Sequence, residues 1–169
     1  MNQDIEEQFL KAHDAYADAL FRHCYFRVYD RELAKDLTQE TFCRTWTYLA
    51  EGKEIGNIRA FLYRVLHHVI VDEIRRKKSI SLDRLIEKGF SPQDESFLEG
   101  EDQRRVVTEL LQKLSRLDEP YRDAVRMRFV DELSPKEIAS ILGVSENVVS
   151  VRIHRGTKKL RHLLHAEQA

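Results

Sequence analysis

A series of hydrogen-bonding and cationic side chains near the C-terminal end of the chain has the types and spacing that suit a nucleic acid. On a helix beginning at Ser145, these side chains lie away from an apolar stripe formed by Val149, Ile153 and Leu160. Amide, hydroxyl and guanidinium groups can bond to base edges in a major groove, and cations further along pair with phosphates. The members of this series are Asn147, Ser150, Arg152, Arg155, Lys158 and Lys159.

The element expected to position this series is the second of two short helices. Ser134 is an N-cap followed by a proline and, at the third helical position, by Glu137, so a helix is predicted to begin at Pro135. Gly143 can end that helix in the left-handed conformation, and Ser145 can cap the next. Two caps around a glycine turn favour a helix-turn-helix over an ordinary helical hairpin with a solvated charged face.

A second group with possible chemistry lies on a helix predicted over residues 58–78. Aromatic, histidine and arginine side chains alternate there with a broad apolar face, and rings that stack on unpaired bases beside cations suit single-stranded nucleic acid. A helix buried by its aromatics and solvated by its arginines would have the same pattern. The residues outside the apolar face are Arg59, Tyr63, Arg64, His67, Arg75, Arg76, Lys77 and Lys78.

A metal-dependent enzyme is a third hypothesis, since His67, His68, Asp72 and Glu73 are close in sequence. Their spacing lacks an HExxH pattern, and adjacent histidines on a helix point about 100° apart, which argues against a shared metal. Cys24 and Cys43 have no ligand spacing and are expected to be reduced thiols. No cofactor and no metal are expected.

Composition favours an all-α protein, because the 169 residues include only three prolines and six glycines, and this length allows either one large domain or two small helical domains. Helices are expected over residues 4–28, as one helix or two short ones, and over 31–49, 104–117 and 118–131. Residues 79–103 combine glycine, proline and serine with an acidic excess, which predicts an extended acidic linker between domains 1–78 and 104–169. With no apolar run of membrane-spanning length and an acidic start, the chain is expected to be cytoplasmic without membrane insertion.

Charge is segregated along the chain although the formal net charge is −1. Residues 1–58 and 79–103 are net negative, whereas residues 59–78 and 134–169 are net positive. Because local charge decides what a surface attracts, the two positive segments are the expected nucleic-acid contacts.

Three separated blocks together resemble the extracytoplasmic-function (ECF, group 4) sigma factors of bacterial RNA polymerase. The first two blocks are CYFRVYDRELAKDLTQETFCRTW at 24–46 and FLYRVLHHVIVDEIRRKK at 61–78. The third is LDEPYRDAVRMRFVDELSPKEIASILGVSENVVSVRIHRGTKKLR at 117–161. The resemblance implies sigma region 2 over residues 1–78, an acidic linker that occupies polymerase channels, and sigma region 4 over residues 104–169. It implies a factor without catalysis that directs core polymerase to promoters and assists DNA melting.

The resemblance also assigns roles to particular positions. The expected contacts with a coiled coil of the largest polymerase subunit are Asp36, Gln39, Glu40, Arg44 and Trp46. The expected contacts with the melted −10 strand are Asn57, Arg59, Phe61, Tyr63, Arg64, His67 and His68, with Arg75, Arg76 and Lys77 at phosphates. The expected contacts with the −35 duplex are Asn147, Val148, Ser150, Val151 and Arg152, with Lys136, Arg155, Lys158 and Lys159 at phosphates. An anti-sigma factor is an expected further partner.

Two departures from the family pattern affect these roles. The family often has Asn where this chain has His68, and Thr-Val-Lys-Ser where it has residues 148–151, Val-Val-Ser-Val. Fewer polar groups in the groove predict a readout by thymine methyl contacts, backbone contacts and DNA shape. A free-standing helix-turn-helix regulator that binds duplex DNA without polymerase is the competing hypothesis.

Overall fold

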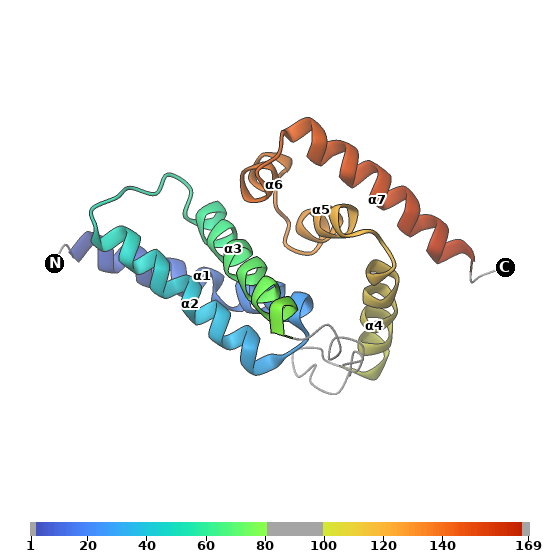
Figure 1. Ribbon diagram of the computed structural model, residues 1–169, viewed down its shortest axis with the longest axis horizontal. Helices are drawn as coiled ribbons and strands as arrows, with labels where there is room; N and C mark the ends of the chain where they lie inside the picture. Colours follow the sequence, from blue (N-terminus) through green and yellow to red (C-terminus); the bar gives the residue numbers. More distant parts are fainter. Residues whose placement is uncertain (1–2, 81–99, 167–169) are drawn as a thin grey trace. The chain divides into compact units, whose positions relative to one another are not determined.

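The computed structural model describes residues 3–80 and 100–166, and within these ranges every regular element is an α-helix (Figure 1). The helices are α1 (Gln3–Val28), α2 (Arg31–Ala50), α3 (Ile58–Ile80), α4 (Glu101–Ser115), α5 (Glu119–Phe129), α6 (Pro135–Leu142) and α7 (Glu146–Ala166). The predicted all-α fold is confirmed, and residues 4–28 lie in one helix rather than two.

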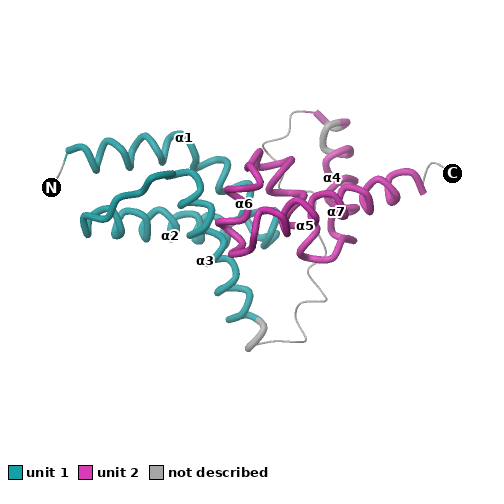
Figure 2. The backbone as a smooth tube through the Cα atoms, turned by 90° about the horizontal axis from the view of Figure 1, so that it is seen from above, with its two compact units in different colours: residues 1–89 teal, residues 90–169 magenta. Residues whose placement is uncertain are grey.

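The chain divides into two compact units, residues 1–89 and residues 90–169 (Figure 2). Most of the predicted linker lies outside the described residues. Its two ends are helical, because α3 continues to Ile80 and α4 begins at Glu101.

Unit 1 is a three-helix bundle in which α1 and α2 run antiparallel and α3 packs on both (Figure 1). Asp30 caps α2 by accepting a hydrogen bond from the Leu33 N–H at 3.0 Å, and Tyr29 before it takes a positive φ of 51° to make the turn. The core joins α1, α2 and α3 through Leu20, Leu37, Leu49, Leu62, Leu66 and Ile70. These side chains recur at helical spacing, so one face of each helix is removed from water.

Unit 2 is formed by α4 to α7, with α7 packing against α4, α5 and α6. Leu114, Val125, Met127, Leu133, Ile138 and Val149 are buried and form its core. Gly156 of α7 lies so close to α5 that a Cβ there would be 2.6 Å from Val125 Cγ2 and 3.1 Å from the Tyr121 carbonyl oxygen. The missing side chain therefore sets how closely these two helices approach.

Candidate nucleic-acid interface

The predicted helix-turn-helix is present as α6 and α7. The Ser134 side chain accepts from the Glu137 N–H at 3.2 Å, and the Glu137 carboxylate accepts from the Ser134 N–H at 2.8 Å, which completes a capping box. Gly143 ends α6 in the left-handed conformation with φ 66°, and the Ser145 hydroxyl accepts from the Val148 N–H at 3.2 Å to start α7. Local signals in the sequence thus fix both ends of the turn.

The first turns of α7 present a mixed apolar and polar face. The Val149 side chain is fully buried in the core of unit 2, whereas Val148 and Val151 are 38% and 41% exposed. Asn147 and Ser150 are exposed beside them. This arrangement leaves methyl groups, an amide and a hydroxyl together on one accessible side of the helix.

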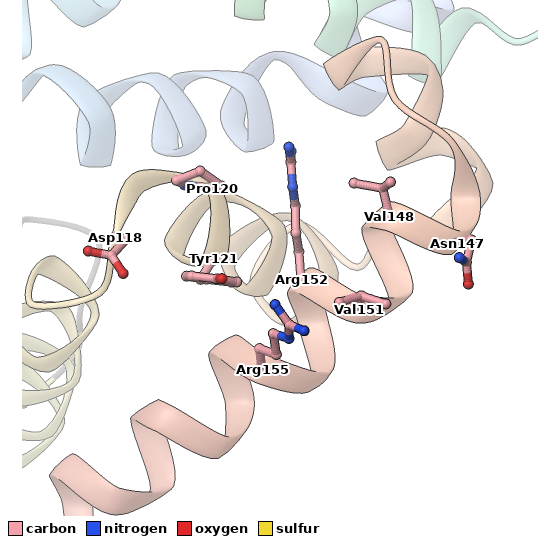
Figure 3. A pocket seen from close by; sticks show the side chains of 8 residues that line it. All are labelled: Asp118, Pro120, Tyr121, Asn147, Val148, Val151, Arg152 and Arg155. Carbon is pink, nitrogen blue, oxygen red and sulfur yellow. The ribbon is translucent and has the colours of Figure 1, made fainter.

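An open groove lies between that side of α7 and the start of α5, with a volume of about 370 Å³ (Figure 3). Side chains of α7 form one wall, and residues at the start of α5 form the other. The groove is lined by Asp118, Pro120, Tyr121, Asn147, Val148, Val151, Arg152 and Arg155. The predicted groove residues Asn147, Val148, Val151 and Arg152 are therefore neighbours in space, while Ser150 is exposed but is not in the lining.

The cations predicted to contact phosphates differ in their surroundings. Lys136, Arg155 and Lys158 are exposed, and Arg152 is half-buried. Lys159 is engaged by the Asp118 carboxylate at 2.9 Å and lies 4.6 Å from the centroid of the Tyr121 ring. The hydrogen bond that the Lys159 ammonium donates to the Asp118 carboxylate is the main reason that the pKa of Lys159 is raised.

On α3 the structure corrects the prediction for Tyr63. Tyr63 was expected outside the apolar face, but it is only 2% exposed and its ring packs edge-on against buried His23, with centroids 5.2 Å apart. It belongs to the core because α1 crosses α3 at this position, and the sequence of α3 alone cannot reveal that neighbour. Tyr63 is therefore not available to stack on a base in this structure.

Phe61 stands at the centre of a cluster of two aromatic rings and two cations, of which only Phe61 and Arg64 were predicted contacts. Its ring lies 4.8 Å from that of Tyr48 on α2, and the Arg64 guanidinium lies 5.4 Å from its centroid. Lys53, in the loop before α3, lies 5.0 Å from the Tyr48 ring. Sequence reasoning missed Tyr48 and Lys53, because nothing in local spacing links the end of α2 to Phe61.

The other predicted residues near the start and middle of α3 have distinct environments. Asn57 caps the helix, since its side-chain oxygen accepts from the Ala60 N–H at 2.9 Å. His67 and His68 have ring centroids 6.1 Å apart, with His68 exposed and His67 and Arg59 half-buried. Within residues 3–80 and 100–166 no group of three or more His, Cys, Asp and Glu is placed to hold a metal ion.

At the basic end of α3, two of the cations share one acid. Arg76 makes two hydrogen bonds of 2.9 Å to the Glu73 carboxylate, and the Lys77 ammonium is 3.8 Å from it. The Arg76 guanidinium is the main cause of the lowered pKa of Glu73. Arg75 is exposed, and no described carboxylate lies within ion-pair distance of it.

The predicted polymerase contacts on α2 share an exposed face. Asp36, Gln39 and the ion-paired Glu40 and Arg44 are exposed along α2, and the thiol-bearing Cys43 is exposed among them. Trp46 is half-buried, because its ring packs edge-on against Phe9 at 5.1 Å. Trp46 is thus partly occupied by packing within unit 1.

The other cysteine, Cys24, is shielded from reagents. Cys24 is fully buried, and burial raises the pKa of its thiol to about 12. Cys43 is exposed and is therefore the cysteine accessible to thiol reagents.

Comparison with known proteins places the two units in one class. The model of "Sigma-70 region 2" matches residues 12–80, and that of "Sigma-70, region 4" matches residues 101–160. Unit 1 and unit 2 therefore contain sigma-70 region 2 and sigma-70 region 4, respectively.

Full-length relatives narrow the class further. The RNA polymerase sigma factor YlaC of Bacillus subtilis is 31% identical over 93% of this chain and 90% of its own length. The ECF RNA polymerase sigma factor SigW of the same organism is 29% identical over 94% of this chain and 90% of its own length. The solved sigma factor RpoE of Bartonella quintana shares the fold with a TM-score of 0.74 and 20% identity, over 97% of this chain and 98% of RpoE.

The chain belongs to the ECF sigma factors, the promoter-specificity factors of RNA polymerase, as the sequence resemblance predicted. Among the described residues, no helix combines the length and the apolar character needed to cross a membrane.

Proposed function

We propose that unit 2 of this sigma factor binds the −35 element as duplex DNA and that unit 1 binds the −10 element as a melted strand. The observation that carries the proposal is the outward face of α7, where Asn147, Val148, Val151 and Arg152 line one groove while Val149 anchors the helix. A helix presented in this way can enter a major groove with its N-terminal residues at base edges.

Apolar contact is central to the readout by α7. Val148 and Val151 offer methyl groups where a polar side chain would offer hydrogen bonds, and thymine carries a methyl group in the major groove. Asn147 and Arg152 add hydrogen-bond donors next to them. Lys136, Arg155 and Lys158 supply cations for phosphates on either side.

The accessible side chains of α3 and its preceding loop bind the melted strand. His68 is exposed and Arg59, Phe61, Arg64 and His67 are half-buried, so edges of rings and cations remain accessible to unpaired bases. The contacts among Lys53, Tyr48 and Phe61 tie the loop to the start of α3 and hold that surface in place. Arg75, Arg76 and Lys77 continue the positive surface toward the phosphates, although Glu73 partly neutralises Arg76 and Lys77.

The exposed face of α2 is the contact with the coiled coil of the largest polymerase subunit. Asp36, Gln39, Glu40 and Arg44 present charges and an amide along one side of a rigid helix, and the exposed edge of Trp46 adds apolar area. Mixed polar groups beside a partly exposed aromatic ring are typical of protein interfaces. The chain has no catalytic role of its own and acts in the cytoplasm, where it joins the core polymerase.

Cys43 provides a direct test of this face. A maleimide label should react with Cys43 in the free chain, and Cys24 should stay unlabelled because it is buried. Bound core polymerase should slow that labelling at least about tenfold, and a chain already labelled should bind core more weakly. Equal labelling rates with and without saturating core would contradict the assignment of this face.

An anti-sigma factor is a further proposed partner. The similar fold of RpoE was solved in complex with the anti-sigma factor NepR. A protein that covers the polymerase and DNA surfaces of this chain would keep it inactive.

One pair of substitutions in each unit tests the two proposed DNA contacts. With core polymerase and a promoter identified from transcript starts, Arg152→Ala with Arg155→Ala should weaken closed-complex binding at least about tenfold. Changing His68 and Arg75 to Ala should instead reduce melting of the −10 region at saturating polymerase. If either pair of substitutions affected only the step assigned to the other unit, the assignment of −35 binding to unit 2 and −10 melting to unit 1 would be wrong.

A further inference from the structure

The cations of α7 are not equally available to DNA. In the part of the chain that the structure describes, Arg152, Arg155 and Lys158 have no carboxylate within ion-pair distance, whereas Lys159 has Asp118 Oδ2 at 2.9 Å. Lys159 also lies over the Tyr121 ring, with its ammonium 4.6 Å from the centroid. The last of these four cations is therefore held against α5 by an acid that lies far from it in the sequence.

The Asp118 side chain is not required to start α5. Asp118 occupies the N-cap position, but its carboxylate makes no capping hydrogen bond. The backbone carbonyl of Asp118 accepts from the Tyr121 and Arg122 N–H groups, each at 3.0 Å. A neutral side chain of the same shape would leave these backbone bonds in place.

Asp118 lies on the side of unit 2 that is proposed to face DNA. It lines the groove together with Arg152 and Arg155, and its carboxylate stands at the start of α5 on one side of that groove (Figure 3). Arg155 is one turn before Lys159 on α7, and its positive charge repels the Lys159 ammonium. Asp118 therefore supplies to Lys159 the negative charge that a DNA phosphate would supply in a complex.

We propose that Asp118 is an intramolecular competitor of the DNA backbone, which occupies Lys159 in the free chain and reduces the affinity of unit 2 for duplex DNA. The proposal rests on the proposed role of α7 at the −35 duplex and adds a negative element to it. Such an element favours promoter binding that depends on polymerase over binding by the free chain, because the remaining contacts must come from unit 1 and the core.

The competition is expected to be moderate. Lys159 and Asp118 have side chains that are 51% and 70% exposed, and exposed ion pairs contribute little net stability. Phosphate binding can therefore displace Asp118, but the displaced carboxylate stays near the DNA and repels it. Replacing Asp118 by Asn removes the competition and the repulsion at once.

The test measures binding of the full chain to a fluorescent duplex of about 30 base pairs over a series of salt concentrations. Asp118→Asn should tighten binding about three- to tenfold at ~0.1 M salt and steepen the slope of log K against log salt by about one. Asp102→Asn on α4 is the matched control, because it makes the same change of charge at an exposed site outside the groove. Lys159→Gln added to Asp118→Asn should remove most of the gain.

The outcomes separate this proposal from the proposed function. Equal or weaker binding by Asp118→Asn, or an equal gain from Asp102→Asn, would overturn the competition and would indicate that Asp118 only positions α7. Such a result would leave the proposed function intact as long as the chain with core polymerase still binds promoters. If the complex of core polymerase with the unchanged protein did not bind promoters, the proposed function would be refuted instead.

Discussion

At the scale of single residues, the same side-chain types have different roles according to what surrounds them. Val149 is a core residue, whereas Val148 and Val151, its neighbours in sequence, line the groove. Cys24 is a buried thiol with a raised pKa, whereas Cys43 is exposed on α2. Burial and nearby charge, rather than residue type, therefore decide which groups can react or bind.

Burial of Cys24 predicts a pH dependence of stability. The thiol has a pKa of about 12 in the folded chain and about 8.5 when unfolded, so the unfolded chain loses its proton first as pH rises. The stability of unit 1 should fall above about pH 8.5 by up to ~1.4 kcal/mol per pH unit. Cys24→Ala should remove this part of the dependence, as measured by urea unfolding followed by the fluorescence of Trp46, the single tryptophan. An identical pH profile for both proteins would contradict the assignment.

The basic end of α3 gives a second prediction at this scale. Arg75→Ala should lower the salt slope of open-complex formation by about 0.7, because Arg75 is free to meet a phosphate of the single strand. Glu73→Gln combined with Arg76→Gln removes a pair that is already neutral, so it should change the slope much less. A larger change from the double substitution than from Arg75→Ala would show that Arg76 is the main phosphate contact.

At the scale of elements, packing between helices decides what local sequence signals leave open. The caps of α6 and α7, the turn at Gly143 and the start of α3 were all predicted, because each depends on residues within about four positions. Burial of Tyr63, the contact of Tyr48 with Phe61 and the Asp118–Lys159 pair were not, because each joins residues on different helices. The sequence therefore predicted the helices and their caps, but not which side chains would be engaged within the fold.

The close contact of α5 and α7 at Gly156 is a prediction of this kind. Gly156→Ala should force the helices apart and destabilise unit 2 by about 1–3 kcal/mol, because the new methyl group meets Val125 and the Tyr121 backbone. Gly56→Ala is the matched control, since a Cβ there meets nothing within 4 Å. Unfolding followed by circular dichroism should show an early loss of helix that Trp46 fluorescence does not report. Unchanged unfolding of the Gly156 variant would contradict the packing.

At the scale of the whole molecule, the proposed function combines two helical units, each with a DNA contact that is expected to be weak by itself. In the proposed function, the exposed face of α2 joins the chain to the core polymerase, and α3 and α7 then contact separate promoter elements. Linking two such contacts through one polymerase raises their combined affinity without strengthening either. Promoter binding should therefore require the complete complex.

Footprinting of one mapped promoter with the chain alone, with core polymerase alone and with both is the most direct measurement of this claim. Protection of the −35 and −10 regions is expected only when both proteins are present. Equal protection of the −35 region by the chain alone, or no protection by the combination, would contradict it.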